Sequence, residues 1–289
     1  MNTKIKKKNK YKYPKILLTG GTGQLGVELK KVLHFLGEVW APNRKHFNLA
    51  EPETLRKKIK NYEPDLIINT AAYTAVDQAE LNLELASYVN KDSPKVLAEE
   101  AFYLEIPFIH YSTDYVFEGH KKIPYVESDE TNPINVYGKT KLEGEYEIQK
   151  KHNQYLIFRT SWLFGTHGKN FYTTMLKLFK EKEIVNVVCD QVGSPTSVKF
   201  LAKATIEILS QLKKNDKENR WGVYHLTGEE KMTWYDFAKK IYKKEKKMNK
   251  FKTKKILPIS CKKYFTEALR PNFSALNCSL IQQKFKNIY

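Results

Sequence analysis

The sequence contains no apolar run close to the ~20 residues that a membrane-spanning helix needs. Its lysine-rich start, Met1–Tyr13, is not followed by an apolar stretch of the signal-peptide type. Only three of the 289 residues are cysteines, Cys189, Cys261 and Cys278, and no two of them form a CxxC pair. This spacing indicates neither a disulfide framework nor a zinc site. We therefore expect a cytoplasmic protein with no membrane partner.

Arginine is also scarce, since only five of the 50 basic residues are arginines. The formal net charge is +18, but most of the excess lies in two lysine-rich segments, residues 1–15 and 243–255. Nucleic-acid recognition relies mainly on arginine, whose guanidinium group makes bidentate contacts. We therefore interpret both segments as solvated surfaces and expect no specific nucleic-acid partner. Weak attraction to anionic surfaces or to RNA stays open as the alternative.

Hydrophobic residues make up 41% of the chain, which is enough for a folded core. In the first half, short apolar segments read as strands at 15–19, 38–41, 65–70, 106–111 and 155–161. They alternate with helical patterns at 24–36, 52–62, 81–104 and 136–151. This alternation predicts an α/β fold with a doubly wound parallel sheet of the Rossmann type.

The pattern loosens after about residue 165. There we expect helices at 171–182, 197–212 and 233–247, and strands at 184–188 and 222–226. This half predicts a smaller lobe, some of whose segments return to the sheet. The predicted organisation is a basic tail over residues 1–13, a dinucleotide-binding domain over 14–165, and an interleaved substrate-binding lobe over 166–289.

A glycine-rich loop follows the first predicted strand directly. Gly20, Gly23 and Gly26 have the spacing GxxGxxG, and a helix is predicted from Gln24. In such loops the first glycine permits the tight turn, the second lets the backbone approach a pyrophosphate, and the third lets the helix pack on the strand. The strand–turn–helix context indicates a dinucleotide site formed by these glycines with Gln24 and Leu25.

The residues after the second predicted strand bear on the choice of cofactor. An acidic side chain there would bind the adenosine ribose hydroxyls and favour NADH. This sequence has Pro42-Asn43-Arg44-Lys45 instead, and the guanidinium group of Arg44 suits a 2′-phosphate. We expect NADPH as the cofactor, with NADH as the alternative if Arg44 is only a solvated side chain.

Tyr137 and Lys141 stand near the start of a predicted helix and, four positions apart, share one of its faces. A neighbouring ammonium lowers the pKa of a tyrosine, so this spacing predicts that Lys141 makes Tyr137 a proton donor or acceptor near neutral pH. Ser112 and Thr113 follow the fourth strand at the carboxyl edge of the sheet, where ligands bind. They offer a hydroxyl partner for Tyr137.

The glycine loop and the Tyr137–Lys141 pair resemble the extended short-chain dehydrogenase/reductase superfamily. Further stretches resemble the dTDP-4-dehydrorhamnose reductase family: NTAAYTAVD from Asn69, HYSTDYVF from His110, NVYGKTKL from Asn135, FRTSW from Phe158, DQVGSPT from Asp190 and RPNFS from Arg270. The resemblance covers about residues 14–285 and is most specific in STDYVF and DQVGSPT.

This resemblance implies an enzyme that uses NADPH to reduce the 4-keto group of dTDP-4-dehydro-6-deoxy-L-mannose to dTDP-L-rhamnose, a nucleotide sugar used for surface polysaccharide. By matched position, Tyr137 would be the general acid, Lys141 would tune it and bind the nicotinamide ribose, and Thr113 would polarise the keto group. Ser112 and Asp114 would flank the sugar.

Further binding residues follow from the same resemblance. The cofactor residues that it adds are Asn48, Leu49, Ala72, Tyr73 and Thr74. The family commonly has an acid near position 48, so Asn48 is a departure that affects the ribose or adenine contacts. Trp162 would pack against the substrate, with a core role at a strand end as the alternative. Arg270 would reach a substrate phosphate, or else form a salt bridge within the smaller lobe.

Metal binding and assembly are less defined. The seven histidines have no metal-ligand spacing, and we expect His110 and His225, in predicted strands, to be buried and hydrogen-bonded. Some relatives dimerise through magnesium held by acidic side chains, so the resemblance implies a homodimer, but no magnesium ligand is assignable here. Other functions stay open: a nucleotide-sugar epimerase or dehydratase, a non-catalytic regulatory subunit with this fold, or a basic nucleic-acid binder.

Overall fold

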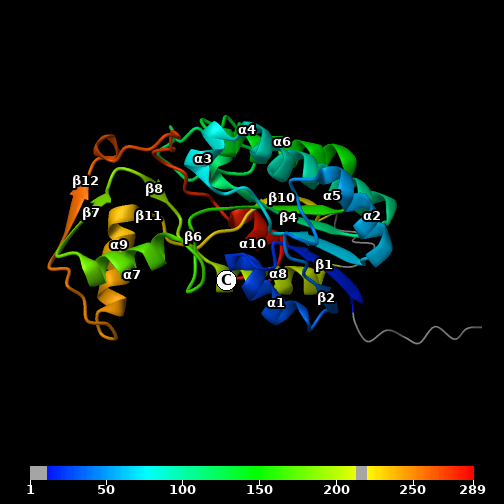
Figure 1. Ribbon diagram of the computed structural model, residues 1–289, viewed down its shortest axis with the longest axis horizontal. Helices are drawn as coiled ribbons and strands as arrows, with labels where there is room; N and C mark the ends of the chain where they lie inside the picture. Colours follow the sequence, from blue (N-terminus) through cyan, green and yellow to red (C-terminus); the bar gives the residue numbers. More distant parts are fainter. Residues whose placement is uncertain (1–11, 213–219) are drawn as a thin grey trace, which may run out of the picture.

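A computed structural model describes residues 12–212 and 220–289, so the predicted basic tail lies almost entirely outside the described residues. Six parallel strands form the central sheet in the order β10-β5-β4-β3-β1-β2 (Figure 1). They are β1 (Lys15–Thr19), β2 (Glu38–Trp40), β3 (Leu66–Asn69), β4 (Phe108–Thr113), β5 (Tyr155–Thr160) and β10 (Gly222–His225). The predicted doubly wound parallel sheet is confirmed.

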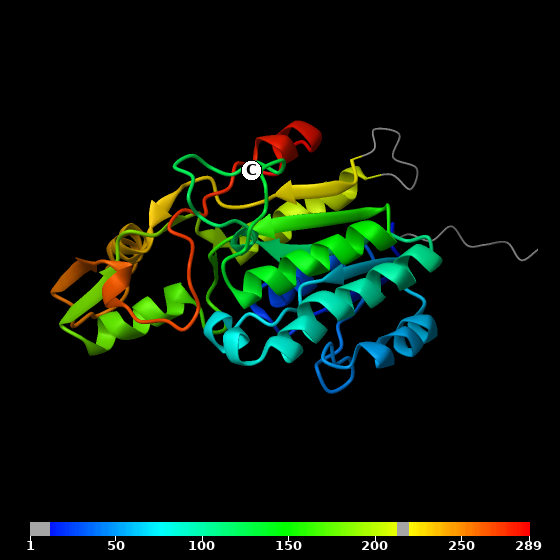
Figure 2. The same cartoon turned by 90° about the horizontal axis from the view of Figure 1, so that it is seen from above.

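Helices cover both faces of this sheet (Figure 2). One layer contains α1 (Gln24–Leu33), α8 (Val198–Gln211) and α10 (Ser279–Lys284); the other contains α2 (Pro52–Tyr62), α5 (Ser93–Tyr103) and α6 (Val136–Lys151). Alternate residues of β1 pack against the two helical layers, because successive side chains of a strand point to opposite faces. Ile16 and Leu18 pack with α1 and α8, whereas Leu17 packs with α2 and α5.

The helix predicted over residues 81–104 is wrong in one respect, because it is not continuous. The chain forms α3 (Val76–Leu81), α4 (Leu83–Ser87), a π-helical turn (Tyr88–Asp92) and then α5. Within the π turn Asn90 is fully buried, accepts from the backbone N–H of Tyr73 at 2.8 Å and donates to Thr140 Oγ1 at 3.1 Å. The extra residue of the turn thus fixes the segment after β3, and hydrophobic periodicity does not encode it.

The smaller lobe lies beyond one end of the sheet (Figure 1). It contains α7 (Phe171–Glu181), β7 (Ile184–Val188), α9 (Trp234–Glu245) and β12 (Lys255–Ile259). Strands β7 and β12 pair in parallel, and Phe179 and Phe237 lie at the centre of a separate apolar cluster. Strand β12 has no buried residue, which explains why sequence periodicity missed it.

Two short strand pairs lie between the lobes. They are β6 (Leu163–Phe164) with β9 (Thr196–Ser197), and β8 (Val192–Gly193) with β11 (Met232–Thr233). Three elements from the second half, α8, β10 and α10, belong to the larger lobe. In the described ranges, 12–212 and 220–289, no helix has both the length and the apolar character to cross a membrane.

Candidate active site

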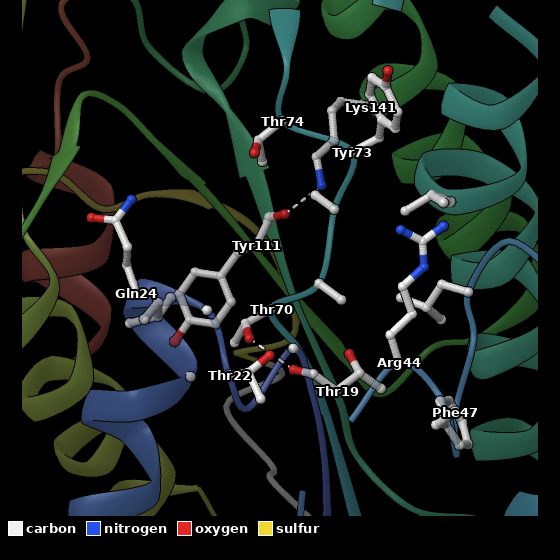
Figure 3. A pocket seen from close by; sticks show the side chains of 18 of the residues that line it. Thr19, Thr22, Gln24, Arg44, Phe47, Thr70, Tyr73, Thr74, Tyr111 and Lys141 are labelled. Atoms are coloured by element: carbon white, nitrogen blue, oxygen red, sulfur yellow. Dashed lines mark hydrogen bonds between the residues drawn. The ribbon is translucent and has the colours of Figure 1, made fainter. Parts of the chain in front are cut away.

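A cavity of about 430 Å³ lies at the carboxyl ends of the central strands (Figure 3). Ligands of open α/β sheets bind in this position, because loops and helix N-termini converge there. All of the cofactor residues expected from the sequence border this one cavity: Gly20, Gly23, Gln24, Leu25, Gly26, Arg44, Asn48, Leu49, Ala72, Tyr73, Thr74, Tyr137 and Lys141. Their contacts with a cofactor stay predictions.

The turn after β1 has room only for glycine. Gly20 has a φ of 70°, in the left-handed region, and a Cβ atom on Gly26 would lie 2.1 Å from the carbonyl oxygen of Gly20. The N-terminus of α1 has no side-chain cap at Gly23 and no acidic residue in its first turn. Its backbone N–H groups and the positive end of the helix dipole therefore form an anion site at the cavity.

Arg44 borders the cavity after β2, across from Gln24 in the view of Figure 3. The side chain is exposed, and its Nε lies 3.4 Å from Asn48 Oδ1. Asn48 in turn donates from Nδ2 to Glu51 Oε1 at 2.7 Å. Arg44 and Lys141 are the two cationic side chains among the described residues of the cavity wall. A guanidinium group is therefore available at the β2 side of the cavity.

Tyr137 lies in the first turn of α6, whose N-cap Asn135 accepts from the backbone N–H of Gly138 at 2.8 Å. Thr113 ends β4, and its hydroxyl lies 3.1 Å from Asp114 Oδ1 and accepts from the backbone N–H of Tyr115 at 3.1 Å. Burial raises the pKa of Tyr137 to about 12; the neighbouring hydroxyl of Thr113 opposes this rise and the charge of Asp114 adds to it. Tyr137 is therefore protonated at neutral pH.

The amine of Lys141 contacts β4. Its Nζ lies 2.6 Å from the carbonyl oxygen of Tyr111 and 3.1 Å from His110 Nε2, so the amine is turned toward β4 (Figure 3). Burial lowers the pKa of Lys141 to about 8, against the opposing charge of Glu145. Burial dominates the pKa of both groups in the cofactor-free protein, and the lowering of the Tyr137 pKa by Lys141 stays a prediction.

Buried polar atoms at the cavity fit a polar ligand. Ser112 Oγ and Thr160 Oγ1 have no hydrogen-bond partner among the described residues, and both residues border the cavity. Asp114 lies outside the set of described residues that border the cavity; its Oδ2 is also buried without a partner, and burial raises the pKa of this carboxyl to about 7. An unpaired buried polar group costs roughly 1–3 kcal/mol, so hydroxyl-rich ligands such as ribose or a sugar suit this end.

Trp162 follows β5 and lies outside the set of described residues that border the cavity. Its backbone has a φ of 47°, and its indole stacks on Trp234 with centroids 3.3 Å apart and planes at 5°. A Cβ atom on Gly193 would lie 2.3 Å from the Trp162 ring. The indole therefore links the two lobes, and its predicted contact with substrate stays a prediction.

Arg270 makes a bidentate ion pair with Asp77, with N···O distances of 3.0 and 2.8 Å. The hydrogen bond from Arg270 lowers the pKa of Asp77. Because Asp77 lies in α3 of the larger lobe, the alternative of a salt bridge within the smaller lobe is wrong. The predicted contact of Arg270 with a substrate phosphate stays a prediction.

Sequence reasoning missed part of the cavity wall. The additional residues include Thr22, Phe47, Thr70, Ala71, Leu85, Val89, Thr160 and Leu163. Thr70, Ala71 and Thr160 stand within the stretches NTAAYTAVD and FRTSW, so those motifs carried a signal. The apolar residues have no motif that distinguishes them from core residues. The described residues contain no cluster of three or more His, Cys, Asp or Glu side chains suited to a metal ion.

Comparison with known proteins agrees with this geometry. The family model described as RmlD substrate binding domain matches residues 14–288. The dTDP-4-dehydrorhamnose reductases of Burkholderia thailandensis and Escherichia coli K12 are 39% and 40% identical over 276 residues, covering 94% and 93% of this chain and 93% and 91% of theirs. The chain belongs to the dTDP-4-dehydrorhamnose reductase family.

A solved member of this family has the same fold. The crystal structure of dTDP-4-dehydrorhamnose reductase from Bacillus anthracis in complex with NADP superposes with a TM-score of 0.86 at 32% identity, covering 94% of this chain and 92% of that one. The predicted family, fold and enzyme class are therefore confirmed: the chain is an oxidoreductase that uses a nicotinamide cofactor.

Proposed function

We propose that the protein reduces the 4-keto group of dTDP-4-dehydro-6-deoxy-L-mannose to dTDP-L-rhamnose with NADPH. One observation carries this proposal: Tyr137, with the hydroxyl of Thr113 beside it, borders a cavity that the glycine turn and Arg44 also border. A proton donor beside a dinucleotide-shaped cavity is what carbonyl reduction requires. The names of the relatives support the substrate.

The cavity residues fit the parts of NADPH in order. The backbone N–H groups after Gly20 suit the pyrophosphate, Arg44 suits the 2′-phosphate, and Ser112, Thr160 and Lys141 suit the nicotinamide ribose. A bound nicotinamide supplies the hydride for the keto carbon. The presence of Arg44, with no acidic residue in the cavity wall, supports NADPH over NADH.

Two hydroxyl groups interact with the keto oxygen. The Thr113 hydroxyl polarises the carbonyl group, and Tyr137 transfers its proton as the alkoxide develops. The raised pKa of Tyr137, about 12, is compatible with this role because an alkoxide is a far stronger base than a phenolate. Asp114, Trp162 and Arg270 are the proposed sugar and phosphate contacts, and the smaller lobe is the proposed substrate-binding lobe.

Loss of NADPH absorbance in the presence of the dTDP-4-keto-L-sugar tests the proposal. We expect Tyr137→Phe to fold normally and to lose at least ~100-fold in kcat, because general acid catalysis contributes this much. Tyr103→Phe, on the exposed surface of α5, is the matched control and should keep the wild-type rate. An unchanged rate in Tyr137→Phe would reject the proton-donor role. Isomerised product without net NADPH oxidation would instead indicate an epimerase.

Assembly and location complete the proposal. The three cysteines are free thiols, which suits the reducing conditions of the cytoplasm. A homodimer is proposed by analogy with family members that dimerise through magnesium. Sedimentation of the purified protein with magnesium and with a chelator measures both the assembly and any dependence on the metal.

A further inference from the structure

A chain of buried hydrogen bonds runs across the sheet to Lys141. The Thr19 hydroxyl donates to Asn69 Oδ1, Asn69 Nδ2 lies 3.0 Å from His110 Nδ1, and His110 Nε2 lies 3.1 Å from Lys141 Nζ. All four side chains are at most 2% exposed. His110 is thus buried and hydrogen-bonded as predicted, and it is the group that contacts Lys141 most closely after the Tyr111 carbonyl.

The backbone of Ala71 fixes the direction of this chain. Its N–H group can only donate, and its nitrogen lies 3.2 Å from Asn69 Oδ1. The amide oxygen of Asn69 therefore faces Ala71 and Thr19, and the amide nitrogen donates to His110 Nδ1. An imidazole whose Nδ1 accepts a hydrogen bond carries its proton on Nε2. In the structure, the Nε2–H group of His110 points at Lys141.

The charge state of Lys141 follows from this direction. An ammonium group has three donors and no lone pair, so it does not accept a hydrogen bond from Nε2–H. A neutral amine accepts through its lone pair and still donates to the Tyr111 carbonyl oxygen 2.6 Å away. A charged imidazolium is disfavoured, because burial holds the pKa of His110 well below its ordinary value. A neutral Lys141 is therefore the state that satisfies every contact.

The charges around Lys141 agree with a neutral amine. On its own helix the ionisable neighbours are Tyr137, which is protonated, and Glu145. Glu145 is already bound by Arg159 of β5, which donates from NH2 to Oε2 at 2.7 Å. From β4 the facing group is His110. A charged lysine here has no counter-ion of its own, and because burial lowers the pKa of Lys141 to about 8, the neutral amine predominates above that pH.

We propose that His110 is a positioning residue that holds Lys141 as a neutral amine in the cofactor-free protein at mildly alkaline pH, and that the neutral Lys141 takes up a proton from solvent when the cofactor binds. The proton adds to the amine lone pair that the Nε2–H group of His110 had engaged, so the lysine leaves β4 as an ammonium and turns toward the ribose. The first step concerns the free protein alone. The second step rests on the proposed function.

Nitrogen NMR of the free protein tests the first step without any cofactor. The protein is labelled with ¹⁵N-histidine, and His110→Gln identifies the signals of His110. We expect a protonated Nε2 and an unprotonated Nδ1 at pH 8.5. A proton on Nδ1 instead would overturn the proposal, because Nε2 would then accept from an ammonium group.

Calorimetric titration with NADPH in two buffers of different ionisation enthalpy tests the second step. At pH 8.5 we expect the wild type to take up roughly 0.7 proton per NADPH, from a pKa of about 8 in the free protein. The 2′-phosphate of NADPH does not contribute, since its second pKa lies near ~6. In His110→Gln the amide oxygen accepts from an ammonium group, so uptake should fall below ~0.2 proton.

The control is His152→Gln, which removes another buried histidine whose Nε2 lies 2.9 Å from the Ile106 carbonyl oxygen. Its uptake should equal that of the wild type. Uptake below ~0.2 proton in the wild type, or equal uptake in His110→Gln, would overturn the second step. If NADPH does not bind the wild type at all, the proposed function fails, and the NMR result alone decides the state of Lys141.

Discussion

Every residue of β3 and β4 in the larger lobe is buried, whereas β7 in the smaller lobe buries alternate residues and β12 buries none. The larger lobe closes its core with aliphatic side chains between two helical layers. The smaller lobe closes its core with aromatic rings, among them Phe171, Phe179 and Phe237. Both lobes have a core, but only one has a sheet covered on both faces.

This difference in burial separates the part of the molecule that positions the cavity residues from the part that packs beside it. Strands that are packed on both faces hold their carboxyl ends in place, so the glycine turn, Ser112 and Lys141 have well-defined positions at the cavity. The smaller lobe contacts the larger one largely through side chains, such as the Trp162–Trp234 stack and the Asp77–Arg270 ion pair. The proposed cofactor site thus lies at the edge of the central sheet, and the proposed substrate-binding lobe packs beside it.

Phe179→Ala should give the largest effect and is the most direct way to break this comparison. Removing a fully buried phenylalanine should cost about 3–5 kcal/mol in the stability of the smaller lobe. NADPH affinity should stay within about twofold, because none of the described residues in the Phe179 cluster borders the cavity. Urea unfolding and NADPH titration measure both quantities. Loss of NADPH binding would show that the two lobes unfold as one unit.

Gly26→Ala tests the glycine turn of the larger lobe. The new Cβ atom meets a backbone oxygen at 2.1 Å, so we expect about 1–3 kcal/mol of destabilisation together with at least ~10-fold weaker NADPH binding. Gly37→Ala is the control, since its Cβ atom would lie 1.7 Å from the carbonyl oxygen of Tyr13, away from the cavity. It should lose stability and keep NADPH affinity. Equal affinity losses in both variants would contradict a local role for the glycine turn.

Arg44→Asp should give the smallest effect and sharpens the cofactor assignment. We expect KM for NADPH to rise about 10-fold, from the loss of a charge-assisted contact worth roughly 1.4 kcal/mol, and KM for NADH to change little. Lys45→Asp makes the same change of charge at an exposed neighbour outside the cavity wall and should alter neither value. Parallel steady-state assays measure KM for NADPH and KM for NADH in each of the two variants. Equal shifts for the two cofactors would remove Arg44 from the 2′-phosphate.

The same comparison explains how far the sequence predicted the fold. In the larger lobe α2 and α6 have the predicted bounds, because a capping or N1 residue and an apolar stripe mark them. Strands β6, β8, β9 and β11 are two residues long, too short for any periodicity. Strand β12 lies at the edge of a lysine-rich segment and exposes most of its side chains. Its pairing with β7 depends on the tertiary structure.

The candidate site was predictable where motifs mark it. The glycine turn and the Tyr137–Lys141 spacing identified residues that the structure brings to one cavity. The orientation of Lys141 was not predictable, because it depends on His110 and Tyr111, whose strand position carries no chemical signature. The partner of Arg270 was missed for a similar reason, since Asp77 is far away in sequence and close only in the fold.

The packing of α1 against α8 sets the order in which the protein is completed during translation. Helix α1 ends at residue 33 and α8 begins at residue 198, yet both cover the same face of the sheet. At a synthesis rate of ~5–20 residues per second, the ribosome takes on the order of ten seconds to bridge that interval. During this time the apolar side chains of β1, β3 and β4 on that face remain exposed. We therefore expect the nascent chain to need protection from aggregation until its last third emerges.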